Sequence, residues 1–205
     1  MGLHIIDEAN RCLNCKKPMC QQGCPVHTPI PKVIQLFKEN KVLEAGEILF
    51  ENNPMSVICS IVCNHEKQCA GNCVLGRKGT PVHFSSIETY LSDTYLARMQ
   101  VKAAEKKTQK AAVIGAGPAG MTVAITLAKK GYPVTVFEWK DKIGGITQYG
   151  IPEFRLSKQI LERYEKQMRQ LGIQIRPNTT IGAVLKIDDL LRDGYAAIFV
   201  GTGVW

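Results

Sequence analysis

The sequence predicts two unlike domains: a helical N-terminal domain, and a C-terminal α/β domain with a parallel sheet. All eight cysteines of the 205-residue chain fall within residues 12–73, and the C-terminal half has none. That half instead alternates short apolar strands with amphipathic helices. A polar, charged stretch, residues 100–110, separates the two patterns. We therefore predict domains at 1–105 and 106–205.

Helical spacing of apolar residues predicts three helices in the N-terminal domain. Two lie within residues 29–52, split near Asn40-Lys41, and Asn53-Pro54 ends the second of them. The third covers residues 85–99. The first two helices separate the two groups of cysteines.

The C-terminal domain is predicted to follow a β-α-β order, which favours a parallel sheet. The predicted elements are strand 111–114, helix 118–130, strand 133–138, helix 157–171, strand 173–176, helix 188–192 and strand 196–200.

The formal charge of +8 comes from lysines that are scattered among glutamates, which indicates a solvated surface and no nucleic-acid partner. The first residues lack the basic and apolar regions of an export signal, and no apolar run approaches the roughly 18 residues of a membrane span. We expect a cytoplasmic chain without a membrane partner. In that compartment thiols stay reduced, and cysteine-dense segments usually bind metal.

The cysteines form two groups of four with short internal spacings. They are Cys12-x2-Cys15-x4-Cys20-x3-Cys24-Pro25 and Cys59-x3-Cys63-x5-Cys69-x3-Cys73. Spacing alone leaves open iron–sulfur clusters, two all-thiolate zinc sites, or a disulfide framework, which a reducing compartment disfavours. The Cys-Pro ending of the first run is also the ending of the cysteine run in two-cluster ferredoxins.

In those ferredoxins the last cysteine of the run binds the other cluster. By the same logic, the first three cysteines of the first group hold one 4Fe-4S cluster, and Cys24 crosses over to a second. Two cysteines of the later group join Cys24, and Cys73 completes the first cluster. Counting alone then makes Cys59 the last ligand of the second cluster.

A glycine-rich turn follows the first strand of the C-terminal domain. The run is Gly115-Ala116-Gly117-Pro118-Ala119-Gly120, and an amphipathic helix follows it. In this fingerprint Gly115 permits a tight turn, Gly117 lets the backbone approach a pyrophosphate, and Gly120 lets helix and strand pack closely. The helix N-terminus favours the anion, and Pro118 suits the first turn.

The next strand, residues 133–138, ends in Glu138, which lies 23 residues after Gly115. An acid at this distance is where a ribose diol would bind. Gly144-Gly145 follows in a short loop that could bring backbone near the same pyrophosphate, or serve as a flexible turn. Strand, glycines, helix and terminal acid together predict a dinucleotide site.

The cysteine pattern resembles that of the small (beta) subunit of NADPH-dependent glutamate synthase, and so do five segments. They are ICSIVCNHEKQCAGNCVLG, VIGAGPAGM, VTVFEWKDKIGG, YGIPEFRL and FVGTG. The same module occurs in dihydropyrimidine dehydrogenase and in the large subunit of NADH-dependent ferredoxin:NADP oxidoreductase. The resemblance implies a helical domain with two 4Fe-4S clusters and a partial Rossmann-type FAD-binding domain.

The resemblance also implies a crossed ligand set. Cys12, Cys15, Cys20 and Cys73 match one cluster's ligands, and Cys24, Cys63 and Cys69 match three ligands of the other. The fourth ligand of the second cluster is then Glu88 and not Cys59. An alternative role for Glu88 is a capping box, because Ser85-x-x-Glu88 has that pattern.

In such enzymes NAD(P)H reduces FAD, and the clusters pass single electrons to a larger catalytic subunit or domain that carries a flavin. No acid–base or nucleophilic residue is needed for this role. Relatives of this type continue with a second nucleotide domain for NAD(P)H, so we expect no NAD(P)H turnover by this chain alone. The rival from another class is a non-enzymatic iron–sulfur or zinc module, which would not need the nucleotide fingerprint.

Overall fold

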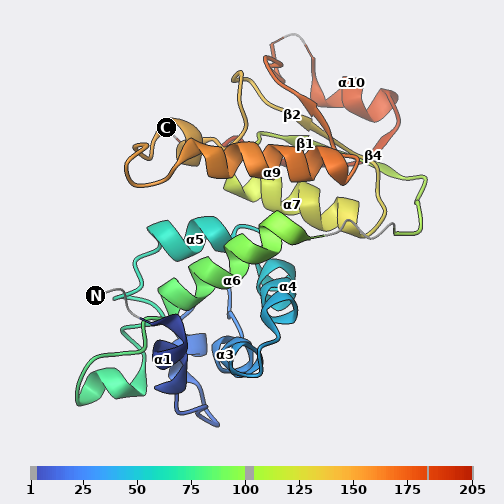
Figure 1. Ribbon diagram of the computed structural model, residues 1–205. Coiled ribbons are helices and arrows are strands. Elements are labelled where there is room, and N and C mark those ends of the chain that lie inside the picture. Colours follow the sequence, from blue (N-terminus) through green and yellow to red (C-terminus); the bar gives the residue numbers. More distant parts are fainter. Residues whose placement is uncertain (1–3, 100–103, 184, 205) are drawn as a thin grey trace. The chain divides into compact units, whose positions relative to one another are not determined.

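The chain divides into two compact units, Met1–Met99 and Gln100–Trp205 (Figure 1). The computed structural model describes residues 4–99, 104–183 and 185–204. The first four residues of the predicted linker, 100–103, lie outside the described residues. The domain boundary predicted between residues 105 and 106 stays a prediction.

The described part of the first unit consists of helices and loops. Its elements are α1 (Ile5–Asn10), α2 (Met19–Gln22), α3 (Ile30–Lys38), α4 (Val42–Asn52), α5 (Ser56–Val62), the 3-10 turn η1 (Val74–Arg77) and α6 (Phe84–Arg98). Helices α3, α4 and α6 confirm the three predicted ones. The other four were not predicted, because runs of four to seven residues are too short to show an apolar period.

The turn between α3 and α4 has a clear sequence cause. Asn40 adopts the left-handed conformation, with φ of 60°, which asparagine tolerates better than most residues. The Asn40 N–H donates to the Phe37 carbonyl at 2.9 Å, and the Lys41 N–H donates to the Leu36 carbonyl at 2.9 Å. These two bonds form a Schellman motif, which satisfies the last carbonyls of α3 and turns the chain into α4.

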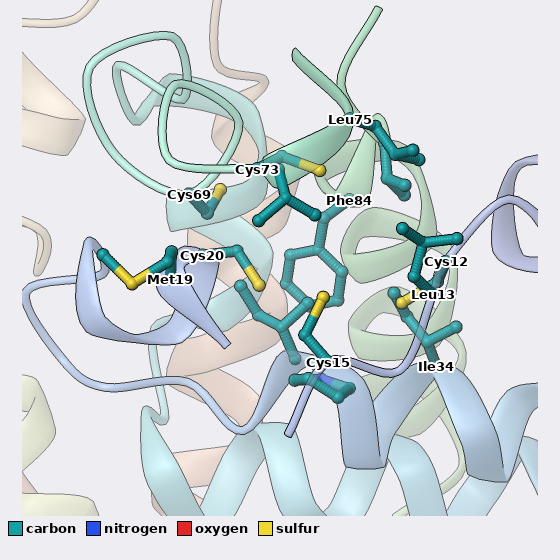
Figure 2. A pocket seen from close by; sticks show the side chains of 14 residues that line it. Cys12, Leu13, Cys15, Met19, Cys20, Ile34, Cys69, Cys73, Leu75 and Phe84 are labelled. Atoms are coloured by element: carbon teal, nitrogen blue, oxygen red, sulfur yellow. The ribbon is translucent and has the colours of Figure 1, made fainter. Parts of the chain in front are cut away.

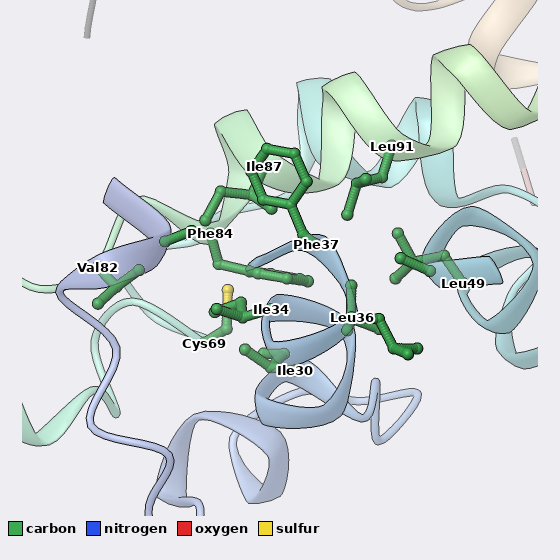
Figure 3. Close-up of a cluster of buried hydrophobic side chains, with 13 residues drawn as sticks. Ile30, Ile34, Leu36, Phe37, Leu49, Cys69, Val82, Phe84, Ile87 and Leu91 are labelled. Atoms are coloured by element: carbon green, nitrogen blue, oxygen red, sulfur yellow. The ribbon is translucent and has the colours of Figure 1, made fainter. Parts of the chain in front are cut away.

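An apolar core joins helices α1, α3, α4 and α6 of the first unit (Figure 3). Helix α6 packs on α4 and α5, and α3 packs on α4 and α1. The core includes Ile34 and Phe37 of α3 together with Ile87 and Leu91 of α6. Cys69, at 7% exposed, belongs to the same core, so the cysteine loops are attached to its packed interior.

The second unit is an α/β domain with a four-stranded parallel sheet in the order β3-β2-β1-β4. Its elements are β1 (Lys110–Ile114), α7 (Pro118–Lys129), β2 (Val134–Phe137), α8 (Ile146–Tyr149), α9 (Lys158–Gln170), β3 (Gln174–Arg176), α10 (Ile187–Arg192) and β4 (Tyr195–Val200). All seven predicted elements are present, and the four-residue α8 was not predicted. The predicted fold class is confirmed.

The strand order creates a switch point at the carboxyl ends of β1 and its neighbours. The chain passes from β1 to β2 on one side and later returns to β4 on the other side of β1. In parallel sheets such a switch point opens a crevice at the carboxyl ends of the strands, where ligands bind. The residues that follow Ile114 and Val200 therefore meet at this crevice.

No helix among the described residues combines the length and the apolar character that crossing a bilayer requires.

Gly46 lies in α4 where α6 crosses it, and a Cβ there would come within 2.5 Å of the Tyr95 Cβ and 2.8 Å of the Leu91 carbonyl oxygen. We predict that Gly46→Ala destabilises the first unit, because overpacking costs about 1–3 kcal/mol and outweighs the ~1 kcal/mol gain in helix propensity. Hydrogen exchange of α4 and α6 amides would measure the fall separately from the second unit. Exposed Glu44→Ala on the same helix is the control, and faster exchange in both variants, or in neither, would contradict the close crossing.

Candidate functional site

Five cysteines from distant parts of the first unit line one hollow (Figure 2): the four predicted for the first cluster, and Cys69, which was predicted for the second. Cys12 and Cys15 lie in the loop after α1, Cys20 lies in α2, and Cys73 directly precedes η1. The hollow encloses about 480 Å³ of empty space, including the solvent at its mouth, and its other walls are mainly apolar. The structure thus brings together the four residues predicted for the first cluster.

The charges of these thiols are coupled to one another. The pKa of the Cys20 thiol is raised to about 11, chiefly by burial. A backbone hydrogen bond at Gln21 lowers this pKa, and the neighbouring Cys73, Cys12 and Cys15 raise it. Each neighbour acts because a thiolate repels a second thiolate. Without a metal the Cys20 thiol therefore favours its neutral form, and ligation would replace its proton.

A second set of groups forms around α5 and α6. Cys63 directly follows α5, Cys69 lies in the next loop, Cys24 follows α2, and Glu88 is in α6. The pKa of the Cys69 thiol is raised to about 12, chiefly by burial and next by the negative charge of Glu88. Cys24 and Cys63 also raise it. Burial, then Glu88, then Cys24 also raise the pKa of Cys63. The structure thus brings together the four residues that the resemblance implies for the second cluster.

Glu88 is 6% exposed, and burial raises its pKa to about 8. No described residue donates a hydrogen bond or supplies an ion pair to its carboxyl group. The alternative capping box is absent, because α6 begins at Phe84 with His83 as its N-cap and no side-chain cap. Glu88 therefore lies in the second turn of α6, too far along the helix to close a capping box.

Cys59 lies in α5 beside this second set, and its sulfur has a different partner. The Asn53 side-chain amide donates a hydrogen bond to the Cys59 sulfur at 3.2 Å. Burial raises the pKa of the Cys59 thiol, the Asn53 bond lowers it, and Glu88, Cys63 and Cys24 raise it. This contact was not predicted from the sequence. It forms because Asn53, at the end of α4, has an extended backbone conformation that turns the chain towards α5.

Two further polar neighbours of the cysteines were also missed. The Cys24 sulfur lies 3.3 Å from the Thr28 hydroxyl, and the Cys69 sulfur lies 3.6 Å from His65 Nδ1. The other His65 nitrogen, Nε2, lies 3.1 Å from the Ser60 carbonyl oxygen. Neither pair lies in a helix, so the i, i+4 spacing, which brings side chains together on a helix, gave no signal for these contacts.

All eight cysteines are unbridged, so the disulfide framework that the spacing left open does not form. Over residues 4–99, 104–183 and 185–204, no three His, Cys, Asp or Glu side chains gather closely enough to hold a single metal ion. A tetrahedral zinc site, with Zn–S bonds of about 2.3 Å, requires such a close group.

The nucleotide fingerprint occupies the carboxyl end of β1. Gly115 has a φ of 97°, and a Cβ there would overlap the Gly201 carbonyl oxygen at the end of β4. A Cβ on Gly120 would overlap the Gly115 carbonyl oxygen. These two glycines are required by the fold itself. The sequence reading missed Gly201 as the neighbour that makes Gly115 necessary.

Gly117 differs from both of them. Its φ of −72° and ψ of −179° suit any residue, and the nearest atom to an added Cβ is the Gly145 Cα at 4.0 Å. The protein thus leaves room for a side chain at Gly117. Pro118 opens α7, and exposed Ala119 stands in its first turn, where helix N–H groups lack intrahelical partners.

The Gly144-Gly145 loop lies directly against the fingerprint. The Gly144 N–H donates to the Ala116 carbonyl at 2.7 Å. Both glycines have positive φ, 114° and 52°, and a Cβ on Gly145 would lie 2.9 Å from the Gly117 Cα. The loop thus packs directly against Gly117.

Glu138 follows β2 and is 3% exposed. Its carboxylate accepts hydrogen bonds from the Ala116 N–H at 2.6 Å and from the Lys140 N–H at 2.9 Å. Each carboxylate oxygen keeps a further lone pair. Glu138 thus fixes the glycine loop onto the end of β2, and it stands at the edge where a ribose would lie.

Two protein families match this chain, and their matched ranges overlap over residues 65–100. Residues 2–100 match the family described as "Dihydropyrimidine dehydrogenase domain II, 4Fe-4S cluster". Residues 65–204 match the family described as "Pyridine nucleotide-disulphide oxidoreductase". The chain belongs to the pyridine nucleotide-disulphide oxidoreductase family. The expected 4Fe-4S type of the N-terminal domain and flavin type of the α/β domain are confirmed at this level.

Individual relatives are more specific. The chain is 35% identical to the small chain of NADPH glutamate synthase from Escherichia coli (strain K12), over 97% of this chain and 42% of that protein. The small chain from Azospirillum brasilense is 36% identical with the same coverage. PreT, the NAD-dependent dihydropyrimidine dehydrogenase subunit of Salmonella typhimurium, is 33% identical over 98% of this chain and 49% of its own length. The chain spans less than half of each relative, and the predicted resemblance is confirmed.

The contrast between the glycines generates a prediction about nucleotide binding. We predict that Gly117→Ala leaves thermal stability unchanged, because there is room for its Cβ, yet weakens FAD binding at least tenfold by filling the space of the pyrophosphate, a loss of about 1.4 kcal/mol or more. Quenching of flavin fluorescence measures the affinity. Gly120→Ala is the matched control, because its Cβ overlaps backbone and it should lower the unfolding temperature. Unchanged FAD affinity in a folded Gly117→Ala chain would exclude Gly117 from the binding surface.

Proposed function

We propose that the first unit binds two 4Fe-4S clusters with crossed ligation. Cys12, Cys15, Cys20 and Cys73 hold the first cluster, and Cys24, Cys63, Cys69 and Glu88 hold the second. Support comes from the donor set: the four thiols of the first site line one hollow, and Cys69 reaches it from the neighbouring set. That second set consists of three thiols and a buried carboxyl group. Thiolates are the usual ligands of such clusters, and an oxygen ligand would alter the potential of one of them.

The observation that carries this proposal is the environment of Glu88. A buried carboxyl group without a hydrogen bond or ion pair is costly, and it is retained where a cation or a proton compensates it. Cys63 and Cys69 act electrostatically on the same site and would bring iron to it. Glu88 thereby obtains the partner that the protein's own side chains do not provide.

The second unit would bind FAD at the switch point of its sheet. Gly117 and the first turn of α7 would receive the pyrophosphate, with Gly144 and Gly145 as the facing wall, and Glu138 would bind the ribose hydroxyls. Gly115, Pro118, Ala119 and Gly120 shape this loop. Bound FAD accepts a hydride's two electrons and releases them singly, which suits one-electron clusters. The close packing of the two glycine loops supports this assignment.

Together these sites define an electron-transfer subunit of the glutamate synthase small-chain type. We propose that the complete protein takes electrons from NAD(P)H and passes them through FAD and the clusters to a larger partner subunit carrying a flavin, in the cytoplasm, where thiols stay reduced. The residues of this chain bind and position the carriers and need no acid–base chemistry. A dihydropyrimidine dehydrogenase-type subunit is the second candidate, favoured by the match to PreT. The partner that co-purifies with the complete protein would distinguish the two.

Metal analysis tests the cluster proposal. We predict about eight irons and about eight acid-labile sulfides per anaerobically reconstituted chain, as two 4Fe-4S clusters require. The double variants C12A/C20A and C63A/C69A should each retain about half of this iron, because each loses two ligands of one cluster only. C59A is the matched cysteine control and should retain all of it. Two zinc ions and no sulfide per chain would overturn the proposal in favour of the zinc module.

A further inference from the structure

We propose that Cys59 is a reserve ligand of the second metal site, held off the iron by Asn53. The inference rests on the proposed function and deepens it by assigning two competing donors to one coordination position. Glu88 supplies the resident oxygen. Cys59 supplies a thiolate when the oxygen is removed or when its hydrogen bond to Asn53 is broken.

Cys59 lies within reach of the same site as Glu88. Helices α5 and α6 pack together, and the Thr89 hydroxyl donates to the Ser60 hydroxyl at 2.9 Å across this contact. These two residues directly follow Glu88 and Cys59 in sequence, so the hydrogen bond fixes the two helices at the level of both donors. Cys59 also interacts electrostatically with Glu88, Cys63 and Cys24, which are three of the four proposed ligands.

Hydrogen bonds fix the backbone and the side chain of Asn53. It is 8% exposed, and its side-chain oxygen accepts a hydrogen bond from the Met55 N–H at 3.0 Å. Its backbone N–H donates to the Leu49 carbonyl at 2.8 Å, and its carbonyl accepts from the Ser56 N–H at 2.9 Å. These bonds orient the side-chain amide, and its nitrogen, Nδ2, donates a hydrogen bond to the Cys59 sulfur at 3.2 Å. This hydrogen bond favours the side-chain conformation in which the Cys59 sulfur lies against Asn53.

The exchange of donors balances simply. When Cys59 takes the place of Glu88, the iron–oxygen bond breaks, an iron–sulfur bond forms, and the thiol proton passes to the freed carboxylate or to water. No electron is transferred in this step. Because oxygen and sulfur ligands give an iron–sulfur cluster different reduction potentials, the choice of donor sets the potential of this cluster.

Iron counting and electron paramagnetic resonance of the anaerobically reconstituted full chain test the reserve role. We expect E88A to retain about eight irons, as in the wild type, because Cys59 completes the cluster. The double variant E88A/C59A should fall to about seven irons and show the signal of an oxidised three-iron cluster, because one iron lacks a protein ligand. A three-iron signal in E88A alone would overturn the proposal, and so would full iron content in E88A/C59A.

Two more variants keep this test decisive if E88A folds poorly. E88C/C59A places a thiolate at position 88 and should keep about eight irons, which shows that the helices tolerate both changes. C59A alone should keep the wild-type spectrum of the reduced cluster. Loss of iron in C59A would make Cys59 the resident ligand and overturn the reserve role. The proposed pair of clusters would stand in that case, because the wild-type iron and sulfide contents test it separately.

The positioning role of Asn53 has its own readout. N53D keeps the oxygen that accepts from the Met55 N–H but removes the donor to Cys59. We expect the reduced-cluster spectrum and potential of N53D to move towards those of E88A, and C59A in the N53D background to restore the wild-type spectrum. A merely structural role for Asn53 predicts no such restoration. An N53D spectrum that C59A leaves unchanged would overturn the role assigned to Asn53.

Discussion

The constraint on which the first unit depends is the meeting of thiols from two distant groups around common sites. Cys73 lies beside Cys12, Cys15 and Cys20, although more than fifty residues separate it from them. Helices α3 and α4 fill the intervening sequence and supply the apolar core against which Cys69 is buried. The loops that carry the cysteines are thus attached to a packed interior. The positions of their sulfurs follow from the packing of α3, α4 and α6.

The sequence predicted the parts of this arrangement that depend on local chemistry. The Asn40 turn, the periodic helices and the Cys-Pro run can each be read from adjacent residues. The place of Glu88 could not be read locally, because Ser85-x-x-Glu88 has the pattern of a capping box and only tertiary packing begins α6 at Phe84. The Asn53–Cys59 hydrogen bond was also beyond the sequence, since it depends on how the chain turns between α4 and α5.

The second unit was easier to predict, because its fingerprint consists of glycines whose positions are set by backbone contacts. Gly115 and Gly120 are needed by β4 and by the loop itself, whatever binds there. Gly117 is needed by neither, and the structure leaves room for a side chain there. The sequence fingerprint treats all three glycines alike, and the structure separates the two that build the loop from the one that faces outward. The close approach of Gly145 completes this division, because it depends on a loop 28 residues further along the chain.

The two halves also differ in how far they are prepared for their cofactors. Glu138 has both carboxylate oxygens bonded to backbone N–H groups, so the nucleotide edge is electrostatically satisfied before anything binds. Glu88 has no such partner, and burial raises the pKa of the Cys63 and Cys69 thiols beside it, which favours their neutral forms. Under the proposed ligation, metal binding replaces those protons and compensates that carboxyl group, so cluster insertion would contribute directly to the folding free energy of the first unit. The second unit needs no comparable contribution. The flavin half is thus preorganised, whereas the cluster half reaches its full stability only with its metal.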